Sequence, residues 1–242
     1  MDKDLLYENH VEWIPYSKQQ LSVAGADHIF IIDISSEFEK ITDYNSVLSQ
    51  QEIAKAARFF KQEDKQNYLV RRYALRMLLG AYLRQSPAEI RFHQSANRKP
   101  SLPGINFNTS HTSNFAVIAL SESPIGIDIE KVHPDFQFSD LLNQCFSPEE
   151  ITYVNSSSDV PMIFFTLWTR KEALLKATGE GIVDNLQQVS AMEVHTERNN
   201  FNYQLHSMHY DSTIVSIARS KNEAHMNYWR LNNIPSFYQT KR

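Results

Sequence analysis

Hydrophobic and polar residues alternate with a period of two over residues 124–130. This alternation predicts a half-buried β-strand, because successive side chains of a strand point to opposite faces. Ile127 and Ile129 would share the buried face. The carboxylates of Asp128 and Glu130 would then project side by side from the other face of a rigid element.

Helical spacing of apolar residues is found in two other parts of the chain. Residues 46–84 are rich in Ala, Leu, Lys, Arg and Gln and predict two helices, with Arg72 and Arg76 together on a face away from the apolar stripe. Residues 147–150 read Ser-Pro-Glu-Glu, which is typical of a helix start with Ser as the N-cap. A longer helix is expected over residues 160–177, ended by the Gly-Glu-Gly sequence that follows.

The remaining pattern predicts short strands and a division into two lobes. Residues 110–114 are expected to form a turn between two paired strands. The predicted strands are 29–34, 90–92, 105–109, 115–120, 187–194, 201–208, 212–219 and 225–231. We expect an α/β protein of the α+β type, with lobes at 1–121 and 122–242. Each lobe would pack a small antiparallel sheet against helices, which suggests an internal duplication.

Charge is distributed unevenly along the 242 residues, whose net charge is -4. Residues 51–100 hold eleven Lys or Arg and four acids, which is +7 locally and leaves -11 for the remainder. A mildly acidic chain with one basic segment is not a typical nucleic-acid binder. The segment suits a small polyphosphate ligand or an acidic protein partner.

The single cysteine, Cys145, excludes an internal disulfide framework and fits a reducing compartment. Its apolar neighbours predict a buried side chain rather than a nucleophile. No signal-peptide pattern and no long uncharged apolar run is present, so we expect a cytoplasmic chain without a membrane span.

The adjacent carboxylates of Asp128 and Glu130 are candidate metal ligands. Such a pair suits a hard divalent cation such as Mg²⁺, completed by water and phosphate oxygens. Gly126, just before them, would allow a ligand or another backbone to approach closely. The alternative is an exposed strand face that carries two acids.

Glu172 and Lys176 lie four residues apart on the long predicted helix and therefore share a face. They could form a simple surface ion pair. Alternatively, Glu172 is a third metal ligand or a general base, and Lys176 neutralises phosphate charge beside it. Lys171 could act similarly or be solvated.

Ser110 and His111 are adjacent, a geometry that rarely supplies a nucleophile and its base. The chain has no Gly-x-Ser-x-Gly sequence and no P-loop. A hydroxyl and an imidazole in a loop make better sense as phosphate ligands, and the alternative is a turn with no role.

Taken together, these motifs resemble the 4′-phosphopantetheinyl transferase superfamily. They stand in the family's order and near its spacing: Asn108-Thr109-Ser110-His111, residues 126–130, Phe146-Ser147-x-x-Glu150, and a helix motif from Trp168 to Gly181. Arg98-Lys99-Pro100 matches a weaker basic motif, and Thr109 stands where the family often has an apolar residue. The length resembles the surfactin-synthetase-activating type, a pseudo-dimer within one chain.

The resemblance implies a reaction and roles for the site residues. A carrier-protein serine would attack the β-phosphate of coenzyme A, and 3′,5′-ADP would leave. Asp128 and Glu130 would hold catalytic Mg²⁺, while Glu172 would either complete that shell or deprotonate the serine. Lys176 would sit against the pyrophosphate and stabilise the departing charge.

The resemblance also implies the residues that bind the nucleotide end of coenzyme A. Ser110 and His111 would contact its phosphates, with His111 on the 3′-phosphate. Lys55, Lys99, Arg72 and Arg76 would line the nucleotide site. The active site would lie in the cleft between the lobes of a monomer.

Two other functions would use some of the same residues. A Mg²⁺-dependent pyrophosphate hydrolase acting on coenzyme A or a nucleotide needs the same acids but no protein acceptor. A non-catalytic carrier-binding protein has no need of Asp128, Glu130, Glu172 and Lys176. The carrier, an acyl carrier protein or a peptidyl carrier domain of fatty-acid, polyketide or nonribosomal-peptide synthesis, is left open by the sequence.

Overall fold

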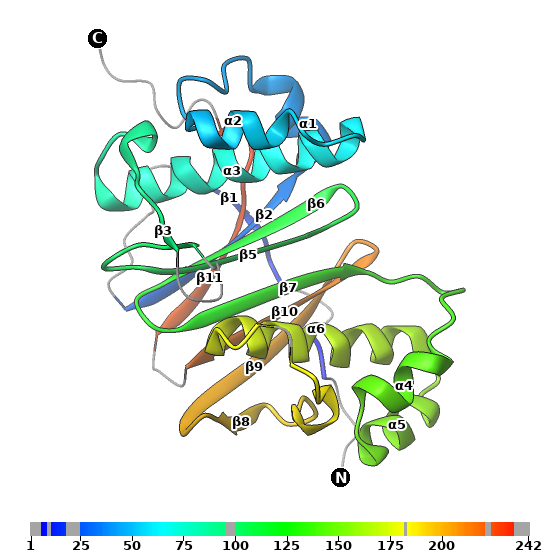
Figure 1. Ribbon diagram of the computed structural model, residues 1–242. Helices are drawn as coiled ribbons and strands as arrows, with labels where there is room; N and C mark the ends of the chain where they lie inside the picture. The colour runs from blue at the N-terminus through cyan, green and yellow to red at the C-terminus, as the bar shows by residue number, and fades with distance from the viewer. Residues whose placement is uncertain are drawn as a thin grey trace.

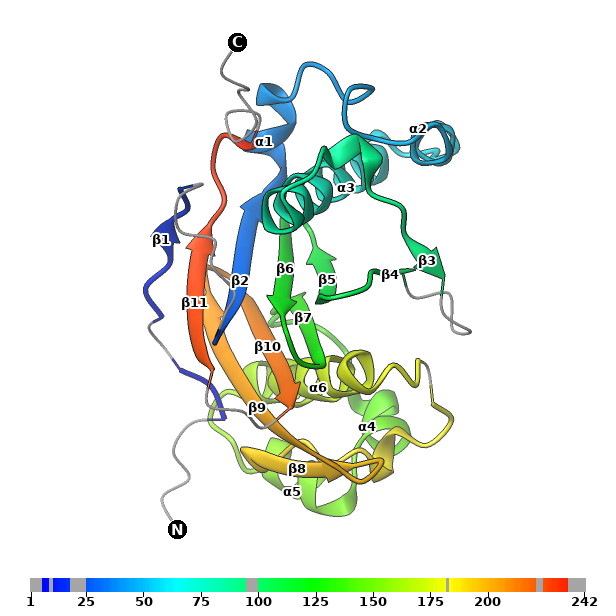
Figure 2. The same ribbon diagram turned by 90° about the vertical axis from the view of Figure 1, so that its left-hand side faces the viewer.

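A computed structural model describes residues 6–8, 11–17, 25–94, 100–181, 183–220 and 224–234. Two β-sheets pack face to face between two layers of helices (Figures 1 and 2). The helices are α1 (Ile34–Lys40), α2 (Gln50–Ala56), α3 (Gln62–Leu83), α4 (Ser139–Cys145), α5 (Pro148–Asn155) and α6 (Val160–Thr178). Short 3-10 turns cover Pro87–Glu89 and Leu186–Gln188.

The strands of the first sheet come from both ends of the chain. Its order is β1 (Ile14–Pro15), β11 (His225–Arg230), β2 (Ala26–Asp33), β6 (Phe115–Ser121) and β5 (Asn106–Thr112). The second sheet has the order β7 (Ile125–Lys131), β10 (Thr213–Ser220), β9 (Phe201–Tyr210) and β8 (His195–Arg198). A small ribbon pairs β3 (His93–Gln94) with β4 (Pro100–Ser101). We call the first sheet with α1–α3 the N-terminal lobe and the second with α4–α6 the C-terminal lobe.

The alternation of side chains along each strand assigns them to separate cores. In β2, Phe30 and Ile32 face α3, whereas Ile29 and Ile31 face the second sheet. Ile127 of β7 joins the core between the sheets, as its period-two pattern predicts. The mixed α/β fold of two lobes is therefore confirmed.

The sequence order and the lobes do not coincide at the C-terminal end of the chain. β11 pairs in parallel with β2, so a strand from the predicted second lobe extends the first sheet. That sheet is consequently mixed rather than purely antiparallel. Near the N-terminus, Glu8 bridges to Met208 of the C-terminal lobe. The division at residue 121 stays a prediction, and both chain ends cross it.

Local capping signals place the ends of the helices in the C-terminal lobe. Ser147 caps α5, and its side chain and that of Glu150 form a reciprocal capping box. α6 ends at Gly179, whose φ of 75° is in the left-handed region that glycine adopts readily. Cys145 is buried, as predicted.

Three predicted boundaries are wrong. Residues 110–112 belong to β5, and only the turn around Ser113, which has a φ of 47°, links β5 to β6. The predicted strand 187–194 is instead a 3-10 turn and irregular chain before β8. The short strand predicted at 90–92 forms later, as β3. Among the described residues, no helix has the length and apolar character needed to cross a bilayer.

Candidate active site

A close contact between β7 and α6 builds the candidate site. Gly126 lies on the same strand face as Asp128, and a Cβ atom there would stand 2.0 Å from the carbonyl oxygen of Ala173 and 2.4 Å from the nitrogen of Ala177. Only glycine allows the helix backbone to come this near. The contact brings the Glu172–Lys176 turn of α6 against the polar face of β7.

Lys176 reaches across this contact to Asp128. Its Nζ lies 2.6 Å from Asp128 Oδ1 and 3.0 Å from Ser110 Oγ, and the Ser110 hydroxyl donates to the same Asp128 oxygen over 2.6 Å. Asp128 and Ser110 are buried, whereas the Lys176 side chain keeps 29% exposure. The Asp128 carboxylate of β7 therefore contacts side chains from both β5 and α6. The ion pair of Lys176 joins two elements, α6 and β7.

Glu130 and Glu172 complete a group of three carboxylates. Burial, followed by the charge of Asp128, raises the pKa of Glu130 to about 7. The same two causes raise the pKa of Glu172 above its usual range. Glu130 also accepts a hydrogen bond from Thr112 over 3.1 Å. Each of these carboxylates makes the ionised form of its neighbours less favourable, and a positive charge placed among them would stabilise the ionised forms.

The donor chemistry of this group fits a hard divalent cation. Oδ2 of Asp128 is buried and has no hydrogen-bond partner within the described part of the chain. A buried carboxylate oxygen without a donor is costly unless something positive binds it. The fit is partial, because no three His, Cys, Asp or Glu side chains among the described residues converge in the manner of a formed metal site.

His111 follows Ser110 in β5 and points to the other face of the strand, within electrostatic range of Arg71 and Lys176. Partial burial, followed by the positive charges of Arg71 and Lys176, lowers the pKa of His111 to about 4, although the residue remains exposed to solvent. Arg71 of α3 is itself crowded: burial, then the charge of Arg72, lowers its pKa to about 10. The sequence reasoning missed Arg71, and its position directly before Arg72 was the available signal.

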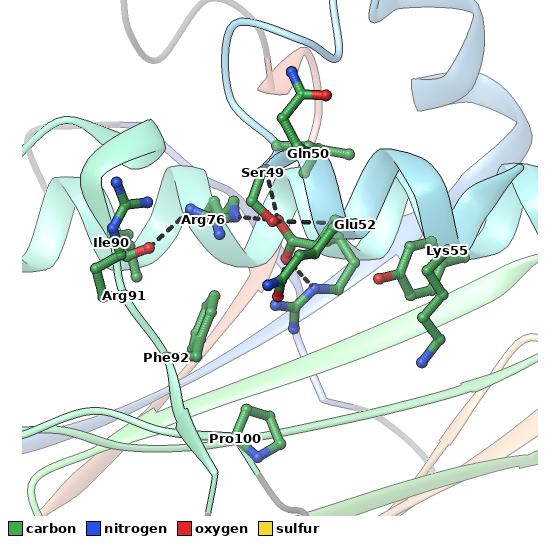
Figure 3. A pocket seen from close by; sticks show the side chains of 13 residues that line it. Ser49, Gln50, Glu52, Lys55, Arg76, Ile90, Arg91, Phe92 and Pro100 are labelled. Atoms are coloured by element: carbon green, nitrogen blue, oxygen red, sulfur yellow. Dashed lines mark hydrogen bonds and ion pairs between the residues drawn. The ribbon is translucent and has the colours of Figure 1, made fainter.

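A pocket of about 790 Å³ opens in the N-terminal lobe (Figure 3). It is lined from α2 by Lys55, from α3 by Arg72 and Arg76, and from the following segment by Phe92 and Pro100. The Arg72 guanidinium stacks over the Phe92 ring at 4.5 Å from its centroid. A pocket with cations and an aromatic face suits a planar, negatively charged ligand.

Glu52 occupies the inner wall of this pocket and determines what the arginines do. It binds Arg72 Nη2 at 2.5 Å and Arg76 Nε at 2.7 Å. Burial alone would raise the pKa of Glu52, but the positive charges of these arginines oppose that effect and the pKa is lowered. Arg76 is buried and also donates to the carbonyl oxygens of Pro87 and Ile90. Arg76 therefore forms part of the pocket wall, whereas Arg72 and Lys55 border the open space.

The sequence also indicates Lys99 and Lys171 as candidate cations. Lys99 falls outside the described residues, with the rest of 95–99. Lys171 is neither solvated nor at the site. It is buried, pairs with Glu150 at 2.6 Å and donates to the carbonyl oxygens of Leu186 and Val189. It joins the capping box of α5 to α6.

Buried carboxylates, a lysine across from them and a cationic pocket suit the chemistry of phosphate esters or anhydrides. Comparison with known proteins gives the family. The model of the 4′-phosphopantetheinyl transferase superfamily matches residues 124–227, and that of the 4′-phosphopantetheinyl transferase N-terminal region matches residues 35–123.

Individual relatives agree with these matches. The chain is 32% identical over 194 residues to the 4′-phosphopantetheinyl transferase HetI of Nostoc, covering 76% of this chain and 81% of HetI. A putative 4′-phosphopantetheinyl transferase of Synechocystis is 36% identical, with 62% of this chain and 64% of that protein covered. For Sfp of Bacillus subtilis the values are 28%, 57% and 63%. The chain belongs to the 4′-phosphopantetheinyl transferase superfamily, and the predicted resemblance to its single-chain type is confirmed.

Proposed function

We propose that this chain transfers the 4′-phosphopantetheine arm of coenzyme A to a serine of a carrier protein, with release of 3′,5′-ADP. The serine oxygen forms a bond to the β-phosphorus, the bond to the bridging oxygen of the pyrophosphate breaks, and the serine proton passes to a base. Family membership supports this reaction. The observation that carries it to these residues is the Lys176–Asp128–Ser110 contact between the two lobes.

Asp128 and Glu130 are the proposed ligands of Mg²⁺. Oδ2 of Asp128, buried and without a hydrogen-bond partner among the described residues, and the raised pKa of Glu130 support this assignment. The cation would supply charge neutralisation on the pyrophosphate. We assign Glu172 as the general base for the carrier serine, because its raised pKa suits it to accept a proton.

Lys176 is proposed to stabilise the charge on the leaving 3′,5′-ADP. Its ammonium group sits beside Asp128 and retains some exposure, so a phosphate oxygen can approach it. Attack on a polyanion depends mainly on positioning and charge stabilisation. In this account Asp128 orients Lys176 as well as holding the cation.

The nucleotide of coenzyme A is proposed to occupy the pocket of the N-terminal lobe. Lys55 and Arg72 border this pocket, Arg71 is within electrostatic range of Arg72 and His111, and Lys176 is within electrostatic range of His111. The cations Arg71, Arg72 and Lys176, with the neutral His111 imidazole, would thus provide the contacts for the phosphates of coenzyme A. We propose Ser110, His111, Lys55 and Arg72 as phosphate or nucleotide contacts, with Arg71 added to them and Arg76 supporting the pocket wall.

We propose an acidic acyl carrier protein or peptidyl carrier domain as the acceptor, a monomeric enzyme, and a cytoplasmic location in keeping with the single buried cysteine.

Product analysis tests the reaction itself. Coenzyme A and Mg²⁺ are incubated with the chain, with and without an apo carrier, and the nucleotides are separated by chromatography. Transfer predicts 3′,5′-ADP in equal amount to the holo carrier formed, and none without carrier. Release of 3′,5′-ADP in the absence of carrier would indicate a hydrolase instead.

A further inference from the structure

We propose that Thr112 is a positioning residue of the cation site, which holds the Glu130 carboxylate in the orientation needed for binding. The inference rests on the proposed function, because that function makes Glu130 a cation ligand. Thr112 is the last residue of β5 and lies in the N-terminal lobe, opposite the strand that carries Glu130.

The direction of the Thr112 hydroxyl is set by its two partners. Its oxygen accepts a hydrogen bond from the backbone nitrogen of Lys131 over 3.3 Å. Its proton then points to Oε2 of Glu130, 3.1 Å away. An ionised carboxylate only accepts hydrogen bonds, so this donor matches the form of Glu130 that binds a cation.

The contact is one of a series that joins β5 to β7. The two strands are edges of different sheets. Alternate β5 side chains bridge them: Asn108 accepts from the nitrogen of Ile127 over 3.1 Å, Ser110 donates to Asp128, and Thr112 donates to Glu130. Successive bridging side chains of β5 contact residues successively further along β7. The N-terminal lobe therefore fixes the carboxylates of the C-terminal lobe.

Hydrogen bonds to ligating carboxylates commonly control metal affinity, and their loss costs about 10- to 100-fold. Ser110 shares its hydroxyl between Asp128 and Lys176, so its substitution would disturb several groups at once. Thr112 offers a cleaner variant. Thr112→Val keeps the shape of the side chain and removes the hydroxyl, and Thr112→Ser restores it.

The test measures Mg²⁺ affinity directly. Mg²⁺ is titrated calorimetrically into the full chain with coenzyme A present and no carrier, so that no transfer occurs. We expect Thr112→Val to raise the dissociation constant about 10-fold and Thr112→Ser to remain near the unmodified chain. Thr109→Val on the same strand is the matched control, since Thr109 alternates to the other face, and it is expected to leave the constant unchanged.

Two results would overturn the proposal. One is a Thr112→Val chain that unfolds at a lower temperature but binds Mg²⁺ like the unmodified chain, which would make Thr112 purely structural. The other is a Thr112→Val chain that loses as much affinity for coenzyme A in EDTA as in Mg²⁺. The Thr112 hydroxyl would then act on nucleotide binding and not on the cation site. If Thr112→Val does not fold, the same comparison is made with Thr112→Ala. Failure of the proposed function is a different outcome, in which the unmodified chain forms no holo carrier.

Discussion

Asp128 of β7 and Lys176 of α6 pair at 2.6 Å because Gly126 lets the backbones of their two elements touch. The pair is therefore a consequence of packing as much as of charge.

Gly126→Ala should separate α6 from β7. The new methyl group would overlap the Ala173 carbonyl oxygen at 2.0 Å, so the helix must move, at a cost of about 1–3 kcal/mol or more in unfolding free energy. Transfer should be largely lost, because Glu172 and Lys176 move with the helix. Denaturant unfolding and turnover check this. Gly104→Ala, where no described atom lies within 4 Å of the new Cβ, should cost backbone strain only and keep turnover.

Lys55→Ala and Arg76→Ala should separate binding from support in the nucleotide pocket. Lys55 is exposed at the pocket, so its loss should raise the KM for coenzyme A about 10-fold, the equivalent of one charged hydrogen bond, with an unchanged melting temperature. Arg76 is buried against Glu52, and its removal should cost about 3–5 kcal/mol of stability. If both variants raised the KM equally and neither lowered the stability, the assignment of Lys55 to binding and Arg76 to support would be contradicted.

Lys171→Met should behave as a core variant despite its place beside Glu172 in the sequence. It leaves the buried carboxylate of Glu150 without its cation, a loss of about 3–5 kcal/mol. Lys176→Met should instead abolish transfer with a smaller change in unfolding free energy, since Lys176 is partly exposed. Thermal unfolding and transfer rates of the two variants give the comparison. A fully stable, inactive Lys171→Met chain would contradict the structural role of Lys171.

Glu172→Gln should distinguish a base from a ligand. If Glu172 accepts the serine proton, kcat should fall about 10²- to 10⁴-fold, while the Mg²⁺ dissociation constant changes little. Asp128→Asn should weaken Mg²⁺ binding strongly. Calorimetric Mg²⁺ titration of both variants is the measurement. Equal weakening of Mg²⁺ binding would make Glu172 a ligand.

The imidazole of His111 should be neutral in the free chain at neutral pH. Its pKa of about 4 lies below the ordinary value, so the ring gains a proton only as the pH falls toward 4. A phosphate dianion beside the ring would favour the protonated form and raise this pKa, so coenzyme A binding should take up a proton and strengthen as the pH falls. NMR titration of His111 with and without coenzyme A tests the shift. In Arg71→Ala the free-chain pKa should rise, because one repelling charge is gone.

Features that depend on local order could be predicted from the sequence. The period-two pattern of residues 124–130 gave the correct faces for Asp128 and Ile127, and the capping residues gave the helix ends. Gly126 was expected to permit a close approach, and the approaching backbone is that of α6.

Features that depend on which surfaces meet could not be predicted. Helical spacing shows that Arg72 and Arg76 share a face, but only the packing of α3 shows that Arg76 is buried and that burial and the charge of Arg71 lower the pKa of His111. The burial of Lys171 depends on Glu150, 21 residues earlier. The parallel pairing of β11 with β2 joins strands from opposite ends of the chain, for which no local pattern exists.

Intact mass spectrometry of the acceptor tests the central claim most directly. An apo acyl carrier protein and an apo peptidyl carrier domain are each incubated with the chain, coenzyme A and Mg²⁺. Parallel reactions contain EDTA or the Glu172→Gln variant. We predict that at least one carrier gains the mass of a single phosphopantetheine and that both controls suppress the gain. Consumption of coenzyme A with no mass gain on either carrier would contradict the account.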